Sequence, residues 1–206
     1  MGNLEILKRG DLQMTSAGTG ISHSEKCHGS KEPVHFLQIW SFPKTSRLEP
    51  KYFTRHFTDD EKRGGWVKIV APVGEKGVEL VREAQGPAPV HSDLTLYATL
   101  LGSGKTLERP LQGKKGYIHV IQTSGYNPLK SQGATVRIRG PGTEQMELKE
   151  GDGAYIFVGE KGNALTVENA GDGNETAEVL VFDLDWMYYI RYVDAVDTTG
   201  VNDIFS

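Results

Sequence analysis

The sequence of residues 8–25 is KRGDLQMTSAGTGISHSE, and the rest of the chain is organised around this stretch. Gly10-Asp11 predicts a tight turn into a strand, and the glycines of Ala17-Gly18-Thr19-Gly20 allow the backbone to bend where a side chain would clash. His23 and Glu25 are two positions apart, so on an extended strand both side chains point to one face. An imidazole and a carboxylate on one face suit a divalent metal of intermediate softness. The stretch therefore predicts part of a metal site.

Composition and charge limit the classes of protein to which this chain can belong. The chain has 206 residues and a formal net charge of −4, which argues against direct binding to a nucleic-acid backbone because such binding needs a basic surface. A single cysteine, Cys27, excludes an intramolecular disulfide and favours a reducing compartment such as the cytoplasm. We expect neither a membrane span nor a signal peptide, because the apolar runs are short and the first residues are polar.

Short strands separated by turns dominate the sequence pattern. Val34–Trp40 is the strongest strand signal, because it is apolar, β-branched and aromatic. The charged, glycine-ended segment Asp59–Gly65 predicts a break between two domains, and Gly86–Pro89 predicts a turn. Further strands are expected at Leu12–Ser16, Tyr52–Phe57, Trp66–Val70, Val78–Val81, Leu94–Leu101, Gly116–Gln122, Ala134–Arg139, Ala154–Val158, Ala164–Val167 and Ala177–Leu184. This spacing indicates an all-β sandwich or barrel.

A short internal repeat suggests a duplicated barrel. Ile6–Asp11 resembles Glu147–Asp152, because a Leu-Lys pair precedes a Gly-Asp turn in both segments. In the second copy, Ala164 and Thr166 stand at the positions that match the candidate histidine and glutamate. We therefore expect any metal chemistry in the first copy.

Other residues that could belong to a functional site also have a structural interpretation. Gln13 and Met14 are expected near the metal cavity, where Gln13 either hydrogen-bonds a ligand or simply lines the barrel. Gly102–Thr106 resembles the end of a phosphate-binding loop, but Thr99 stands where that motif needs glycine, so a hairpin turn is predicted. The remaining histidines are interpreted as structural or surface residues: His28, His35, His56, His91 and His119.

Together these motifs resemble the pirin family of bicupins. The resemblance rests on Gly10–Gln13, Ala17–Glu25 and His35–Trp40, and it covers most of residues 4–186. Later similarity occurs at Glu49–Tyr52, Asp93–Tyr97, Gly151–Ala154 and Val181–Leu184. The resemblance implies an all-β bicupin, with two stacked β-barrels of the jelly-roll type and one metal, usually iron, in the N-terminal barrel.

The resemblance also implies a domain organisation and a ligand set. Residues 1–65 would form the C-terminal part of the first, metal-site cupin, 66–186 a second cupin without metal ligands, and 187–206 a C-terminal arm, starting near Trp186–Ile190 with a short helix or packed segment. The family holds its metal with three histidines and one glutamate, of which the last two map onto His23 and Glu25. The other two come from an upstream His-x-His motif, and no two of the six histidines have that spacing. We therefore expect an N-terminally truncated member with an incomplete first barrel, in which iron is bound weakly or not at all.

Three hypotheses for function follow from the resemblance. The family is linked to quercetin 2,3-dioxygenase activity, which implies an enzyme that opens a flavonol-like small molecule with O2, with Glu25 as metal ligand or base. The alternative is a non-catalytic co-regulator or interaction module that binds a protein partner, or another copy of itself, through exposed strand edges. A third hypothesis is a fragment without a function of its own. The expected location is the cytoplasm, with the nucleus as the alternative for a co-regulator.

Overall fold

A computed structural model describes residues 4–28, 34–125, 132–185 and 191–197. The expected short segment at Trp186–Ile190 lies outside the described residues. In chain order the elements are β1 (Asp11–Ser16), β2 (Val34–Trp40), β3 (Lys51–His56), α1 (Asp59–Arg63), β4 (Val67–Pro72), β5 (Ala88–Val90), β6 (Leu94–Leu101), β7 (Thr106–Pro110), β8 (Lys115–Val120), β9 (Thr135–Arg139), β10 (Met146–Lys149), β11 (Gly153–Phe157), β12 (Ala164–Asn169), β13 (Ala177–Leu184) and β14 (Arg191–Asp197). The all-β prediction is confirmed.

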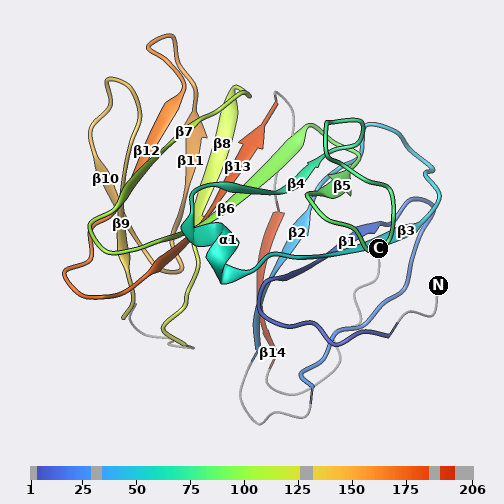
Figure 1. Ribbon diagram of the computed structural model, residues 1–206. Coiled ribbons are helices and arrows are strands. Elements are labelled where there is room, and N and C mark those ends of the chain that lie inside the picture. The colour runs from blue at the N-terminus through green and yellow to red at the C-terminus, as the bar shows by residue number, and fades with distance from the viewer. Residues whose placement is uncertain (1–3, 29–33, 126–131, 186–190, 198–206) are drawn as a thin grey trace.

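The strands from β4 to β13, which follow α1, form two large sheets (Figure 1). The four-stranded sheet has the order β10-β9-β12-β7, and the six-stranded sheet has the order β11-β8-β13-β6-β4-β5. Alternate side chains of both sheets meet in one core cluster, whose fully buried members include Ile118, Val136, Val167 and Val181. This cluster is the core of the second barrel.

Strands β1, β2 and β3 belong to two small sheets, on the right and in the centre of Figure 1. β1 pairs with β3, and β2 pairs with β14, so the described part of the predicted C-terminal arm returns to the first part of the chain. Leu12, Met14, Leu37 and Ile39 pack against a second core cluster, to which β4, β6 and β13 contribute. The two small sheets therefore lie against the six-stranded sheet, which agrees with the bicupin architecture. The domain boundary at residue 65 stays a prediction.

The charged segment before β4, where a break between two domains was predicted, contains the short helix α1. Thr58 caps α1 and accepts a hydrogen bond from the Glu61 amide at 3.2 Å, while the Glu61 carboxylate accepts one from the Thr58 amide at 2.7 Å. This capping box satisfies backbone donors that a five-residue helix otherwise leaves open. The sequence Thr58-x-x-Glu61 carried this signal.

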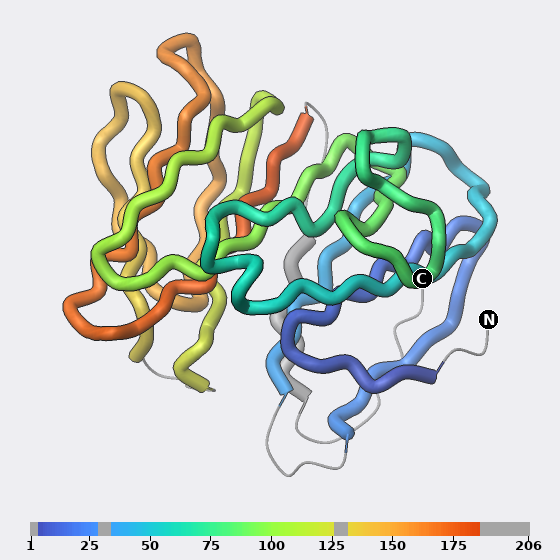
Figure 2. The backbone as a smooth tube through the Cα atoms, viewed as in Figure 1, coloured from blue at the N-terminus to red at the C-terminus, as the bar shows by residue number. Residues whose placement is uncertain are grey.

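The strand predicted at Val78–Val81 is wrong. Among the described residues, no neighbouring strand pairs with this segment. Its backbone is instead hydrogen-bonded by the buried guanidinium of Arg55. Arg55 donates to the carbonyl oxygens of Glu79 at 2.8 Å, Val81 at 3.2 Å and Arg82 at 3.0 Å. Figure 2 shows this green segment lying beside the blue strands of the first part. A side chain on β3 therefore holds the segment in place.

Three further differences between the predicted and the observed secondary structure concern short elements. Ala88–Val90, which overlaps the predicted turn, is β5 and pairs in parallel with β4. Strands β7 and β10 were missed, because Thr106–Pro110 and Met146–Lys149 are rich in charged residues and have little apolar signal. Gly102 and Lys105 close the predicted turn with a hydrogen bond of 3.1 Å, but the turn connects β6 and β7 of different sheets and is not a hairpin.

The two Gly-Asp turns of the internal repeat have the same geometry. In both, the Asp amide donates to the Lys carbonyl three positions earlier, at 3.0 Å for Asp11 and 2.9 Å for Asp152. In both, the Lys amide donates back to the Asp carboxylate. Gly10 and Gly151 have φ values of +87° and +86°, which glycine adopts without strain. The structure thus places the same turn at the start of β1 and β11.

No helix in the described part of the chain is long and apolar enough to cross a membrane.

Candidate functional site

The segment after β1 turns sharply before it reaches the two predicted ligands. Gly20 donates its amide to the carbonyl of Ala17 at 2.9 Å, and Thr19 donates to the carbonyl of Leu48 at 3.0 Å. Gly18 has a φ of +56°, and a Cβ at this position would overlap the Leu48 carbonyl oxygen. Glycine is therefore required where the chain bends, as the sequence predicts.

His23 and Glu25 lie in an irregular segment. The expectation that they share a strand face is wrong, because residues 17–28 form no strand. His23 is exposed, whereas Glu25 is partly buried. Their role as metal ligands stays a prediction.

A chain of polar contacts ties Glu25 to the β1–β3 sheet. Gln13 Nε2 on β1 donates to Glu25 Oε1, and Tyr52 OH on β3 lies 3.1 Å from Gln13 Oε1 and 3.0 Å from Glu5 Oε2. Arg82 forms an ion pair with Glu5, and its guanidinium lies 5.7 Å from the centre of the Tyr52 ring. We call these five residues the Glu25 network: Glu5, Gln13, Glu25, Tyr52 and Arg82.

The phenol of Tyr52 is held in its protonated form. Its pKa is raised to about 12, chiefly by burial, and then by the hydrogen bond to Glu5 and the negative charge of that carboxylate. Arg82 opposes this effect, and Glu25 adds a little to it. Tyr52 therefore remains a hydrogen-bond donor at neutral pH.

The register of β1 and β3 explains why these side chains meet. Thr15 pairs with Tyr52, and Gln13 pairs with Thr54. Side chains alternate between the two faces of a sheet, so Gln13 and Tyr52 are diagonal neighbours on one face. The residues on either side of Gln13 are apolar and pack in the core. Their burial fixes Gln13 on the opposite, polar face, beside Glu25.

His56 and His119 have partners outside the Glu25 network. His56 Nδ1 is 2.5 Å from Asp11 Oδ1, and the buried His119 stacks on Tyr117 with ring centres 6.4 Å apart. Across residues 4–28, 34–125, 132–185 and 191–197, no group of three or more His, Cys, Asp or Glu side chains is placed to hold a metal ion.

His23 and Glu25 carry donor types that suit two positions of a divalent-metal shell. Gln13 holds Glu25 Oε1, and Oε2 accepts no hydrogen bond from the described residues. An imidazole nitrogen and a carboxylate oxygen are donor types that first-row divalent metals accept. A carboxylate in this setting is also able to accept a proton from a substrate hydroxyl.

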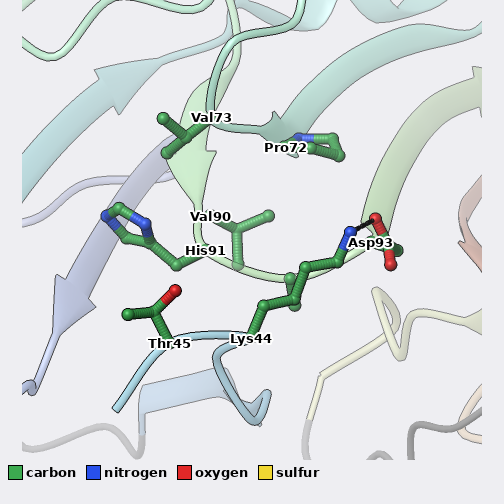
Figure 3. Close-up of a pocket in the computed structure, with 8 residues that line it drawn as sticks. Lys44, Thr45, Pro72, Val73, Val90, His91 and Asp93 are labelled. Atoms are coloured by element: carbon green, nitrogen blue, oxygen red, sulfur yellow. Dashed lines mark ion pairs between the residues drawn. The ribbon is translucent and has the colours of Figure 1, made fainter. Parts of the chain in front are cut away.

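A separate pocket of about 210 Å³ lies between the connector after β2 and the turn after β5. Figure 3 shows Lys44 paired with Asp93 on one side of it and the ring of His91 on the other. The Lys44 amide donates to the His91 carbonyl at 2.7 Å, which ties the connector to the turn. Because Lys44 and Asp93 neutralise each other, the pocket wall offers little charge to select a ligand.

Comparisons with known proteins agree with the motifs around the Glu25 network. The pirin family model matches residues 1–41. A quercetin 2,3-dioxygenase from Escherichia coli is 32% identical over 123 residues, which are 59% of this chain and 48% of that protein. A Mycobacterium tuberculosis relative, provisionally named for the same activity, is 28% identical over 183 residues, which are 89% of this chain and 63% of that protein.

A solved structure shares the fold. The crystal structure of the bacterial pirin YhhW from Escherichia coli in complex with nickel(II) has a TM-score of 0.66 and 28% identity, and the match covers 89% of this chain and 65% of that one. This chain therefore spans less than two thirds of the length of these relatives. The family model, the relatives and the shared fold agree, and the chain is a member of the pirin family.

Proposed function

We propose that this chain is part of a pirin-type cupin metalloprotein in which His23 and Glu25 supply two ligands to a divalent metal, with iron as the metal in the active protein. The observation that carries the proposal is the hydrogen bond from Gln13, which holds a partly buried carboxylate two residues from an exposed imidazole. The nickel(II) complex of the related pirin YhhW supports a divalent metal.

The proposed reaction is the opening of a flavonol by O2, which the name of the Escherichia coli relative supports. A divalent metal, when bound, supplies a Lewis acid that polarises and orients substrate oxygens. His23 and Glu25 would hold this ion; in the alternative role, the Glu25 carboxylate would accept the proton of the flavonol hydroxyl. Gln13 and Tyr52 keep the carboxylate in position. Two side chains fill only part of a metal shell, so turnover requires further ligands.

Divalent-metal binding by the full chain tests the ligand assignment. We expect one equivalent of Ni(II) to bind in a calorimetric titration, with Fe(II) titrated in the absence of oxygen. His23→Ala and Glu25→Gln are each expected to weaken binding at least about tenfold, because each removes one of two donors.

The matched control is His56→Ala, since this histidine pairs with Asp11 and belongs to no proposed shell. Unchanged affinity in either His23→Ala or Glu25→Gln would exclude the assignment. Flavonol consumption by the iron-loaded chain, followed by absorbance, then tests the reaction separately from the binding.

A second function, association with another copy of the chain, is favoured by exposed apolar side chains in the first part. Leu4 and Phe42 are 94% and 72% exposed, and Trp40 at the end of β2 is 43% exposed. The β1–β3 and β2–β14 sheets have two strands each in the described part, which leaves edges able to pair with another strand. Apolar surface beside such edges favours association.

Light scattering over a range of concentrations tests this second function. We expect a dimer or larger species in the unchanged chain and a shift toward monomer when Phe42→Ser and Leu4→Ser are combined. Leu80→Ser, at an exposed apolar residue on the segment that Arg55 holds, is the control. A monomer at every concentration would exclude self-association.

A further inference from the structure

We propose that Gln13 is a positioning residue: its amide, oriented by Tyr52, holds one oxygen of Glu25 and leaves the other oxygen for the metal. The inference rests on the proposed function of Glu25 as a metal ligand. Beyond that function, the inference assigns to Gln13 a role that acts through Glu25, and it identifies the carboxylate oxygen that is left for the metal.

The orientation of the Gln13 amide follows from its two neighbours. An ionised carboxylate only accepts hydrogen bonds, so the NH2 end of the amide must face Glu25. Gln13 Oε1 then faces Tyr52, whose single hydroxyl hydrogen is shared between Gln13 Oε1 at 3.1 Å and Glu5 Oε2 at 3.0 Å. A reversed amide would bring an acceptor oxygen against the carboxylate. One orientation alone therefore satisfies both contacts.

Tyr52 is fixed from its other side. Its hydroxyl also lies 3.0 Å from Glu5 Oε2, and Glu5 is paired with Arg82. Arg55 holds the backbone of Arg82 through its carbonyl oxygen at 3.0 Å. The network therefore runs without a break from a buried side chain of β3 to the carboxylate of Glu25, and it preserves the orientation of the Gln13 amide.

The consequence concerns the coordination of Glu25. Gln13 donates to Oε1, so Oε2 is the oxygen that Glu25 would offer to the metal. Partners that orient a metal ligand typically change metal affinity by 10- to 100-fold when they are removed. Gln13 and Tyr52 should therefore influence metal affinity although neither is a ligand.

The test compares Ni(II) affinity of the full chain with that of Gln13→Met and Tyr52→Phe. Methionine keeps the length of the side chain and removes its hydrogen bonds, so we expect affinity to fall about tenfold or more. Tyr52→Phe removes one hydroxyl that is remote from the metal, and we expect a smaller loss in the same direction. This variant also serves if Gln13→Met does not fold. The control is Thr15→Val, on the same face of β1 but outside the Glu25 network.

The outcomes separate this inference from the proposed function. If His23→Ala weakens binding while Gln13→Met and Tyr52→Phe do not, Glu25 and His23 remain ligands and the positioning role is excluded. If His23→Ala binds as well as the unchanged chain, the proposed function itself fails. The thermal midpoint of each metal-free variant is measured in the presence of a chelator. If Gln13→Met lowers this midpoint in parallel with its loss of Ni(II) affinity, Gln13 has a purely structural role and positioning is also excluded.

A measurement without metal tests the orientation itself. The side-chain NH2 resonances of Gln13, assigned by their absence in Gln13→Met, are expected to shift in Tyr52→Phe and in Glu25→Gln. They should stay unchanged in His56→Ala. Resonances that do not respond to either neighbour would overturn the proposed orientation, whatever the metal affinities show.

Discussion

The guanidinium of Arg9, in the turn before β1, lies 2.8 Å from the carboxylate of Glu178 on β13. Lys62 of α1 places its Nζ 2.9 Å from the other oxygen of the same carboxylate, and Asp59 lies 3.3 Å from both cations. Lys62 and Glu178 are buried. This four-charge cluster joins the turn before the candidate site, the helix and the second barrel, and it makes the first part of the chain depend on the second.

Replacing Lys62 with methionine should destabilise the protein. The change leaves Glu178 buried with Arg9 as its remaining cation, and we expect a loss of about 2–4 kcal/mol in the free energy of unfolding. Arg63→Met is the control, because its ion pair with Asp60 is exposed and exposed pairs contribute about 0.5 kcal/mol. Denaturant unfolding of both variants checks the difference, and equal losses would contradict a structural role for the cluster.

The carboxylate of Glu150 should make stability depend on pH. The buried Glu150 accepts hydrogen bonds from the amides of Gly133 at 2.7 Å, Thr123 at 3.0 Å, Ser124 at 3.1 Å and Gln132 at 3.2 Å. Burial alone would raise its pKa, but the hydrogen bond from the Ser124 hydroxyl, followed by those from the amides, outweighs burial and lowers the pKa below the usual 4.5. A carboxyl with a lowered pKa stabilises the fold above its ordinary value and loses that contribution as pH falls through its folded-state pKa.

The measurement compares unfolding of the unchanged chain and Glu150→Gln at neutral and acid pH. We expect Glu150→Gln to cost about 2–3 kcal/mol at pH 7, because hydrogen bonds to a charged acceptor are lost. The difference should shrink as pH falls below 4.5. Glu144→Gln, at an exposed position, should follow the unchanged chain throughout. A difference that is the same at every pH would exclude the contribution of the charge.

The repeat shows how far the sequence predicted the structure. Strands such as Leu94–Leu101 and Ala177–Leu184 were predicted with their observed bounds, because apolar and β-branched runs between turn residues leave few alternatives. The Gly10-Asp11 and Gly151-Asp152 turns have the same geometry because each is closed by hydrogen bonds within four residues. The first turn carries Arg9 and the second carries Glu150 at the same position, and each bonds a distant segment. That difference depends on tertiary partners, which a local pattern does not reveal.

The candidate site was predicted less completely than the fold. The motif around His23 and Glu25 identified the segment, but its irregular conformation follows from the close approach of Gly18 to Leu48, a residue distant in sequence. Gln13 was placed near the site because it shares the motif. Tyr52 belongs to the similar segment Glu49–Tyr52, but it joins the network only through the β1–β3 register, which sequence spacing does not reveal.

Alanine at Gly18 should test the bend that places the candidate ligands. Gly18 has a φ of +56°, and a Cβ there would overlap the Leu48 carbonyl. We expect a loss of about 2–4 kcal/mol in stability from the combined strain and clash. Gly104→Ala is the control, because its φ is +68° but open space surrounds it, so about 1–2 kcal/mol of backbone strain is expected alone. Thermal unfolding distinguishes them, and equal shifts would show that the contact with Leu48 is unimportant.

Arg55→Met should release the segment that carries Arg82. The guanidinium of Arg55 is the donor to the carbonyl oxygens of Glu79, Val81 and Arg82. Its removal leaves the hydrogen bond from the Thr54 amide to Arg82, at 2.8 Å, and the ion pair of Arg82 with Glu5 to hold the segment. Faster cleavage within residues 78–85 is expected in limited proteolysis with a protease of broad specificity, because cleavage follows local opening.

The control for this release is Arg139→Met, an exposed arginine at the end of β9. Its cleavage pattern should match that of the unchanged chain. Because Arg82 pairs with Glu5 and Glu5 contacts Tyr52, the released segment should also disturb the Gln13 amide resonances in Arg55→Met. Cleavage at the unchanged rate, together with undisturbed resonances, would show that the segment is held by other contacts and that the Glu25 network ends at Tyr52.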